Sequence, residues 1–199
     1  MRSNLTLKQL LVCSSYLGNT TKKWNRFMNS FILSSYYNLC FINLKYTIFL
    51  FNKALNILRT IQLNDGLLVF YLPYNKLSTL YNLDINKLSS MNNFLFYSEW
   101  LPGYLTNWKI FKYQYPVGVF LLGKKSYIDI CNEGFLSGTF TFGFVNNQIA
   151  PHVFQYPIPI NSNSWQGLEF YINLIFFYLI LVRQEELFSY YYQILLKIN

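Results

Sequence analysis

Five short runs of mostly apolar residues constrain the fold of this 199-residue chain more than any other feature. They lie at residues 39–42, 67–71, 94–97, 117–122 and 139–145. A strand with one face in water alternates apolar and polar residues, whereas a strand buried on both faces carries a continuous apolar run. Crossover helices cover both faces of a parallel sheet, so these runs predict a three-layer α/β domain.

Helical spacing of apolar residues appears between these runs. Asn43 precedes a segment in which apolar residues recur every three or four positions to about Gln62, which predicts a helix capped by the Asn43 side chain. A turn is expected at residues 64–66, and Pro73 is expected to prevent extension of the strand at 67–71. Further helices are predicted in the segment that begins at residue 7 and ends near Gly18, at residues 76–88 and at residues 127–133.

The segment at residues 168–182 is the most apolar part of the chain. A membrane span needs roughly 20 apolar residues, whereas this run is shorter and contains Glu169 and Asn173. We therefore predict a helix that packs on the sheet, with Ser164 as its cap and a second helical stretch running to Lys197. A membrane anchor at residues 168–182 is the alternative that this segment leaves open.

Composition indicates a partner and a source. The formal net charge of +8 favours a polyanionic partner, although charge alone does not distinguish RNA from lipid. Lys, Asn, Ile, Phe and Tyr have A/T-rich codons and are abundant, while Ala occurs only as Ala54 and Ala150. This bias is typical of an A/T-rich genome such as an organellar one, so the high aromatic content is not by itself evidence for stacking surfaces.

The residues needed for catalysis or metal binding are sparse. Cys13, Cys40 and Cys131 lack the spacing of a disulfide framework or a zinc site and are interpreted as buried small hydrophobic residues. His152 is the single histidine and accompanies no nucleophile motif. No glycine-rich nucleotide motif is present. The sequence therefore predicts a protein that is not an enzyme, with no cofactor, no metal and no small-molecule substrate.

Four motifs occur in order along nearly the whole chain. The first, at residues 18–28, has the spacing G-x-x-T-x-x-W-N-x-x-M, and the second is N-L-x-x-T at residues 43–47. The third is W-L-x-G-x-L-T-N at residues 100–107, and the fourth is Y-x-I-P-x-N at residues 156–161. Together they resemble the small-subunit ribosomal protein S2 family of bacteria and organelles, in its mitochondrial form.

The resemblance implies both a fold and a role. The fold is a flavodoxin-like parallel sheet flanked by helices, in one domain that consists of an opening helix and basic loop at 1–38, an α/β core at 39–163 and a C-terminal helical segment at 164–199. The implied role is a structural constituent of the mitochondrial small ribosomal subunit, mitochondrially encoded, that binds small-subunit rRNA and neighbouring ribosomal proteins. It implies no homo-oligomer, and membrane integration is not favoured.

The chain also departs from the family pattern at several positions. Asn19 stands where the family has His, Arg26 where it has Pro, and Glu99 where it has Arg. The family inserts a long helical hairpin after the third motif, whereas only a few residues separate Lys109 from Val117 here. The hairpin is therefore expected to be reduced or absent. Asn146 and Asn147 follow Val145 at a D-T-N motif, so the acidic member is missing.

Three basic segments are the candidate RNA contacts. Lysine and arginine side chains pair with phosphates, and an indole stacks on a sugar or base. The predicted residues are Thr20, Thr21, Lys22, Lys23, Trp24, Asn25 and Arg26 in the first segment, Asn107, Trp108, Lys109 and Lys112 in the second, and Lys124 and Lys125 in the third. Without the resemblance, the first segment would be interpreted as a solvated loop, and the third remains equally open to that interpretation.

The apolar part of the third motif has a structural interpretation. Trp100, Leu101 and Leu105 are expected to pack this loop onto the sheet, and Gly103 is expected to allow a backbone turn closed to other residues. Thr106 and Asn107 are expected to cap a helix that follows.

Overall fold

A computed structural model describes residues 6–72, 93–107, 115–122 and 127–198. Its centre is a five-stranded parallel sheet in the order β5-β4-β6-β7-β8. The strands are β4 (Leu67–Tyr71), β5 (Phe94–Tyr97), β6 (Pro116–Leu121), β7 (Phe140–Val145) and β8 (Tyr156–Pro159). Numbered along the chain within this sheet, the order is 2-1-3-4-5, that of flavodoxin-like proteins. The predicted fold class is therefore confirmed.

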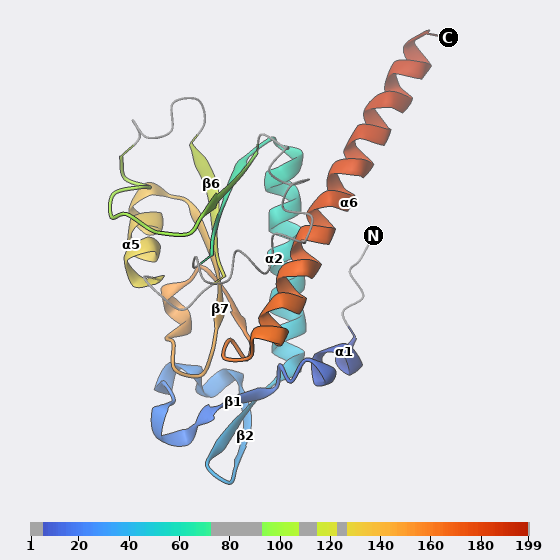
Figure 1. The fold of residues 1–199 in the computed structure, drawn as a ribbon. Coiled ribbons are helices and arrows are strands. Elements are labelled where there is room, and N and C mark those ends of the chain that lie inside the picture. The colour runs from blue at the N-terminus through green and yellow to red at the C-terminus, as the bar shows by residue number, and fades with distance from the viewer. Residues whose placement is uncertain (1–5, 73–92, 108–114, 123–126, 199) are drawn as a thin grey trace.

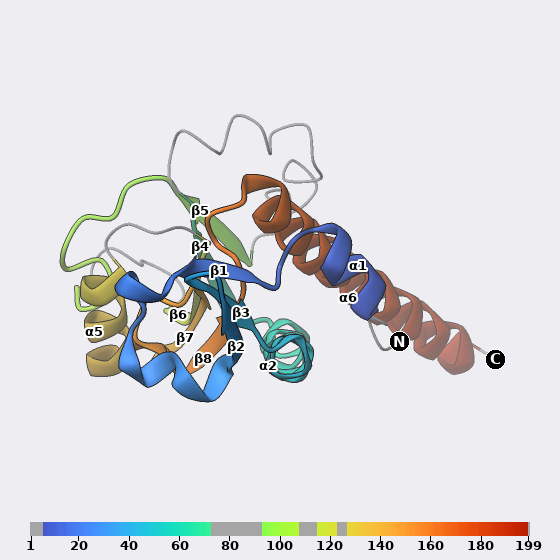
Figure 2. The same ribbon diagram turned by 90° about the horizontal axis from the view of Figure 1, so that it is seen from below.

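Helices cover both faces of this sheet. Helices α2 (Leu44–Leu63) and α6 (Trp165–Ile198) lie on one face, and α5 (Tyr127–Ser137) lies on the other (Figures 1 and 2). Successive strand side chains point to opposite faces, so Phe70 packs in the core below α2 and α6 while Val69 packs in the core on the α5 side. Burial on both faces explains the continuous apolar runs.

Aromatic rings fill the core on the α2 and α6 side. The Phe70 ring stacks on Phe120 with the centroids 6.1 Å apart and meets the edge of Phe176, from α6, at 5.3 Å. Phe120 in turn stacks on Phe142 at 5.7 Å. Burying each of these side chains contributes about 1.5–3 kcal/mol, so these rings are a main source of stability for the sheet and for the docking of α6.

Residues 6–43 form a second, smaller unit. It contains α1 (Leu7–Val12), two 3-10 helices η1 (Thr21–Lys23) and η2 (Arg26–Phe31), and an antiparallel sheet in the order β1-β3-β2. The strands of this sheet are β1 (Leu17–Thr20), β2 (Ile32–Tyr36) and β3 (Leu39–Ile42). We call residues 6–43 the amino-terminal module, and Figure 1 shows β1 and β2 below the parallel sheet.

Two expectations for this region were wrong. The first helix ends at Val12 rather than near Gly18, because Ser14 has a left-handed φ of 51° and Gly18 lies in β1. The run at 39–42 is a strand, but it belongs to the small antiparallel sheet, since a two-residue turn pairs it with β2. The fifth parallel strand is β8, which contains Pro157 and Pro159 and occupies an edge, where proline is tolerated.

The helix after β3 agrees with its prediction. Asn43 Oδ1 accepts a hydrogen bond from the Lys45 N–H at 3.1 Å, which caps α2, and the helix ends at Leu63. The turn that follows includes Asp65 at a φ of 52°. Helix α5 extends to Ser137, four residues beyond the prediction. The predicted helix at 76–88, Pro73 and the site of the reduced hairpin lie wholly or largely outside the described residues.

The C-terminal segment forms one continuous helix rather than two. Ser164 Oγ accepts a hydrogen bond from the Gly167 N–H at 3.4 Å, consistent with the predicted cap, and α6 then runs unbroken to Ile198. Its segment Trp165–Phe188 is long and apolar enough to cross a membrane, but half of the most apolar 18-residue stretch within it is buried inside the protein. Ile172, Ile175 and Leu179 are fully buried in the core that α6 shares with α2.

Candidate RNA interface

The amino-terminal module docks at the carboxyl ends of β7 and β8. Asn147, two residues beyond β7, is fully buried. Its Oδ1 accepts a hydrogen bond from the Asn19 N–H at 2.9 Å, and its Nδ2 donates to the Asn19 carbonyl at 3.0 Å. The Asn147 carbonyl accepts from the Asn25 N–H at 2.6 Å. Asn161, two residues beyond β8, donates its backbone N–H to Ser15 and its side-chain N–H to Ser14.

Open α/β folds bind ligands at the carboxyl ends of their parallel strands. In this chain the amino-terminal module covers two of those ends. Residues 14–25 lie at the carboxyl ends of β7 and β8. Asn19, which replaces the family's His, is the β1 residue that both groups of the Asn147 amide bind. A buried amide with both of its groups paired to the backbone holds the module in one orientation.

The basic loop, residues 20–26, begins at the end of β1 and leads into η2. Lys22, Lys23 and Arg26 are exposed, and Trp24 is 41% exposed. Within the described residues none of these three cations forms an ion pair, whereas Arg59 and Arg183 on α2 and α6 do. Unpaired, exposed cations lose little solvation when they approach a phosphate, so the loop has the chemistry of a polyanion contact.

The rest of the loop supports these side chains. Asn25 Oδ1 accepts a hydrogen bond from the Phe27 N–H at 3.0 Å and thereby caps η2. Met28 follows in η2 and is fully buried in the core on the α5 side. The amide of Asn25 therefore organises the loop, and its neighbours on either side point outward. Thr20 is exposed and Thr21 is half-buried.

A hollow of about 400 Å³ lies between the basic loop and the hairpin formed by β2 and β3. Trp24 and Thr21 line it from the loop, and Ser34 and Ser35 line it from β2. Its lining combines an indole with hydroxyl groups and faces an unpaired basic segment. That combination matches a site for a base or a sugar beside a phosphate.

Basic and acidic residues are distributed unevenly along the chain, and this distribution favours the amino-terminal module as the part that contacts a polyanion. From Met1 to Asn64 the sequence carries eight Lys and Arg residues and neither Asp nor Glu. Every acidic residue comes later, and two of them pair with Arg183 of α6: Glu186 at 2.7 Å and Asp65 at 3.5 Å. The hydrogen bond that Arg183 donates to Glu186 is the largest cause of the raised pKa of Arg183. The module therefore carries basic residues and no acidic residue of its own.

The third motif forms a structural loop against α5. Glu133 of α5 accepts hydrogen bonds from the N–H groups of Gly103 at 2.7 Å and Leu105 at 3.1 Å, and from the Trp100 indole at 3.4 Å. Leu105 is fully buried, and Gly103 has a φ of 96°, which confirms its predicted turn. The prediction for Leu101 was wrong, because its side chain is exposed.

The remaining predicted contacts divide into two groups. Asn107 is exposed, and its N–H donates to the Gly103 carbonyl at 2.9 Å. Thr106 is also exposed, and the helix that Thr106 and Asn107 were expected to cap lies outside the described residues. The other candidates, Trp108, Lys109, Lys112, Lys124 and Lys125, lie outside them as well. The structure thus places the seven residues of the basic loop on one segment and does not describe the other basic segments.

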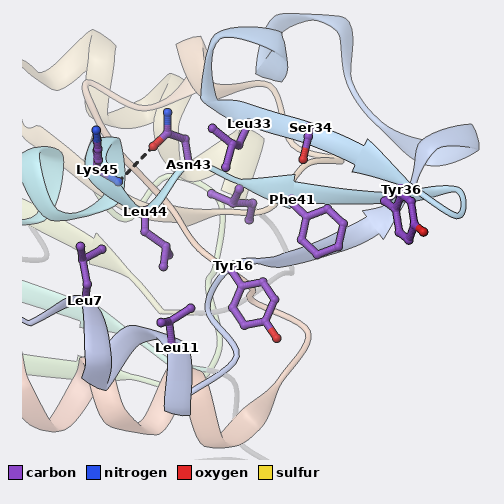
Figure 3. Close-up of a pocket in the computed structure, with 11 residues that line it drawn as sticks. Leu7, Leu11, Tyr16, Leu33, Ser34, Tyr36, Phe41, Asn43, Leu44 and Lys45 are labelled. Carbon is purple, nitrogen blue, oxygen red and sulfur yellow. Dashed lines mark hydrogen bonds between the residues drawn. The ribbon is translucent and has the colours of Figure 1, made fainter.

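An apolar groove of about 640 Å³ lies on another side of the module (Figure 3). Leu7 and Leu11 of α1 form one wall, and Leu44 lies beside Asn43, whose hydrogen bond with Lys45 is drawn there. Further lining comes from Tyr16, Leu33, Ser34, Tyr36, Phe41 and Ile42. Lys45 is the single charged residue in this lining, so the groove lacks the charge density that a polynucleotide contact needs.

The cysteines and His152 show no catalytic arrangement in the described part of the chain. Cys40 and Cys131 are buried as predicted, whereas Cys13 is only half-buried, and all three are free thiols. Burial raises the pKa of Cys131 to about 12, which keeps it protonated and unreactive. The His152 ring packs edge-on against Phe27 with centroids 4.7 Å apart. Among the described residues no group of three His, Cys, Asp or Glu side chains is placed to hold a metal.

Sequence reasoning missed two features of this surface. Asn147 was noted only as a departure from a motif, and its contact with Asn19, 128 positions earlier, has no local signal. The hairpin tip at Tyr36 and Tyr37 was also missed, because its turn lacks the Asn-Gly pair that marks such turns. The available signal was Asn38 beside the aromatic pair, because Asn tolerates a positive φ.

Comparison with known proteins agrees with the motifs. A profile of ribosomal protein S2 matches residues 10–117, which include most of the amino-terminal module, α2, β4 and β5. Small ribosomal subunit protein uS2m of Acanthamoeba castellanii is 28% identical over 87% of this chain and 57% of its own length. The uS2m protein of Schizosaccharomyces pombe is 23% identical over 81% of this chain and 70% of its length.

A bacterial relative shows the same pattern over a shorter segment. Small ribosomal subunit protein uS2 of Wigglesworthia glossinidia brevipalpis is 32% identical over 53% of this chain and 43% of its own length. The chain thus spans about half the length of the Acanthamoeba castellanii and Wigglesworthia glossinidia brevipalpis relatives. The profile match covers more than half of the chain, and the 2-1-3-4-5 sheet agrees with it. On these grounds the chain belongs to the ribosomal protein S2 family.

Proposed function

We propose that this protein is a structural, non-enzymatic constituent of the small subunit of the mitochondrial ribosome and binds its rRNA through the basic loop. The observation that carries the proposal is an acid-free amino-terminal module with Lys22, Lys23 and Arg26 exposed and unpaired within the described residues, in a segment that matches the family. Neighbouring ribosomal proteins are the proposed further partners, and no homo-oligomer is required.

The mitochondrial assignment has two supports. The relatives from Acanthamoeba castellanii and Schizosaccharomyces pombe are named uS2m, and they align with most of this chain. The scarcity of Ala and the abundance of Asn, Ile, Phe and Tyr fit an A/T-rich organellar gene, so we also propose that the protein is mitochondrially encoded. We propose further that residues 1–199 act as one ribosomal-protein domain, in which the module and the parallel sheet form one RNA-binding body.

Sedimentation tests this function against the membrane alternative. Alkaline carbonate treatment leaves an integral protein in the membrane pellet and releases peripheral ribosomes. We expect the protein to be released, and in a gradient of detergent-solubilised mitochondria to migrate with small-subunit rRNA. The segment Trp165–Phe188 is long and apolar enough to cross a membrane, so the opposite result has a physical basis. Retention in the carbonate pellet after ribosomes are stripped would refute the ribosomal assignment.

Salt dependence tests the RNA contact itself. Each lost phosphate contact lowers the slope of log K against log salt by about 0.7–0.9. The triple variant Lys22→Ala, Lys23→Ala, Arg26→Ala is therefore expected to bind small-subunit rRNA more weakly and with a flatter slope. Lys53→Ala on α2 is a matched control, because Lys53 is an exposed cation outside the module. An unchanged slope in the triple variant would place the basic loop away from phosphate.

A further inference from the structure

The tip of the hairpin between β2 and β3 has an unusual residue in its turn. Tyr36 pairs with Leu39, so Tyr37 and Asn38 form a two-residue turn, and their φ angles are 46° and 62°. Two positive φ angles in a row are what a type I′ turn requires, and Asn-Gly satisfies this best. A tyrosine in that conformation is strained, and such strain is concentrated at functional sites.

Burial does not offset this strain. Tyr37 is 83% exposed, and Tyr36, which also lines the outer end of the apolar groove, is 65% exposed, so neither ring packs in a core. The two rings meet edge to face with their centroids 4.4 Å apart, which holds them together as a pair. Two exposed aromatic rings held together on a hairpin tip offer surface on which nucleobases can stack.

The basic loop adjoins the turn that carries this pair. The Thr21 N–H donates a hydrogen bond to the Asn38 carbonyl at 2.8 Å, which joins the loop to the turn, and Lys22 and Lys23 follow at once in the chain. The hollow lined by Trp24 and β2 lies between the loop and the same hairpin. Cations for phosphates and aromatic rings for bases therefore occur on adjoining segments.

We propose that Tyr36 and Tyr37 stack on unpaired nucleotides of an RNA segment whose phosphates lie against Lys22 and Lys23. This inference rests on the proposed function and assigns to the hairpin tip a role separate from the phosphate contacts. Bases inside an A-form duplex are stacked on one another and lie beyond reach of a hairpin tip, so the ligand is a single-stranded loop, bulge or end. The absence of acidic residues before Asp65 favours RNA over a protein surface as the occupant.

The experiment compares variants of the full chain for binding to a fluorescent, uridine-rich RNA oligonucleotide and to a duplex of the same length, each at several salt concentrations. The test variant is Tyr36→Ala with Tyr37→Gly, since glycine accepts the positive φ and leaves the turn intact. Tyr36→Phe with Tyr37→Phe keeps both rings. Phe135→Ala removes a 76% exposed aromatic ring from α5, outside the module.

Loss of base stacking weakens binding by about 5- to 150-fold per base. We expect a loss in this range for the single strand with the test variant, little change for the duplex, and an unchanged salt slope. Both control variants are expected to bind within about twofold of the natural chain. Circular dichroism of the test variant should match that of the natural chain, because no core residue is changed.

The outcomes separate this inference from the proposed function. If the natural chain shows no salt-dependent RNA binding, the proposed function fails and the inference fails with it. If the natural chain binds with a slope that depends on Lys22 and Lys23 but the test variant binds equally well, only the inference is overturned. A test variant that binds RNA normally and yet no longer joins the small subunit would identify the hairpin tip as a protein contact, which also overturns it.

Discussion

Removing the Asn147 amide should loosen the amino-terminal module without unfolding the parallel sheet. Asn147→Ala deletes two hydrogen bonds, of 2.9 and 3.0 Å, and leaves the N–H and carbonyl of Asn19 without those partners. An unpaired buried polar group costs about 1–3 kcal/mol. Asn19 is only half-buried, so water offsets part of the loss, and we expect the free energy of unfolding to fall by about 2 kcal/mol.

The same change should affect RNA binding in a specific way. Free energy lost from the docked module can weaken RNA binding by at most the same amount, which for about 2 kcal/mol is about thirtyfold. The cations of the loop remain, so the salt slope should stay that of the natural chain. This combination of lower affinity and equal slope distinguishes a positioning residue from a phosphate contact.

Three measurements check this prediction. Urea unfolding gives the free energy, hydrogen exchange of the Asn19 amide reports the local opening, and fluorescence anisotropy gives the RNA affinity. Asn56→Ala is the matched control, because Asn56 is an exposed amide on α2 and its removal should change stability by less than about 0.5 kcal/mol. Equal unfolding and equal Asn19 exchange in the two variants would refute the idea that Asn147 holds the module.

Further predictions concern the loop at α5, the buried thiol and α6. Glu133→Gln removes one of the two acceptor oxygens that bind three N–H groups, so the free energy of unfolding in urea should fall by about 1.5–3 kcal/mol and Trp100 fluorescence should shift to the red. No change in either quantity would contradict the described loop. The pKa of Cys131 is about 12 in the folded chain and about 8.5 in the unfolded chain. The free energy of unfolding should therefore fall as the pH rises between these values, by up to about 1.4 kcal/mol per pH unit. Urea midpoints that do not change with pH in this range would refute the burial of Cys131. Phe176→Lys places a charge in the core and should prevent folding, whereas Phe177→Lys, at a 58% exposed position, should still migrate with small-subunit rRNA in a gradient. Loss of co-migration in both variants would favour a membrane span.

The parallel sheet was predictable because most of its strands are continuous apolar runs, which are typical of strands buried on both faces. Residues 67–71 are all buried, and the sequence shows this directly as a continuous apolar run. Asn43 likewise predicts the start of α2, because its side chain caps the helix by accepting a hydrogen bond from an N–H only two residues away. Features that depend on neighbours in the chain were therefore accessible from the sequence.

Features that depend on distant partners were not accessible. Strand β8 contains two prolines and reads as a loop, and it becomes a strand only because an edge position tolerates missing N–H donors. The run at 39–42 has the composition of a core strand but pairs with β1 and β2 instead. A second helical stretch was expected after the apolar run at 168–182, yet α6 continues through residues 183–186, where Glu185 pairs with Arg59 and Arg183 pairs with Glu186.

The candidate interface was predictable to a similar degree. The basic loop follows from local charge and from the motif at residues 18–28, and its cations are exposed. The part played by Glu133, which lies about 30 residues from the N–H groups it binds, follows only from tertiary structure. Asn147 and the tyrosine pair belong to the same class, because each depends on a contact or a turn that composition does not reveal.

Cross-linking of proteins to RNA in isolated mitochondrial small subunits, followed by mass spectrometry of the peptides, tests the central claim most directly. The account predicts nucleotide adducts on peptides that contain residues 20–38, which include the basic loop and the tyrosine hairpin. Adducts confined to α2 and α6, or absence of this protein from subunits that retain their rRNA, would contradict it.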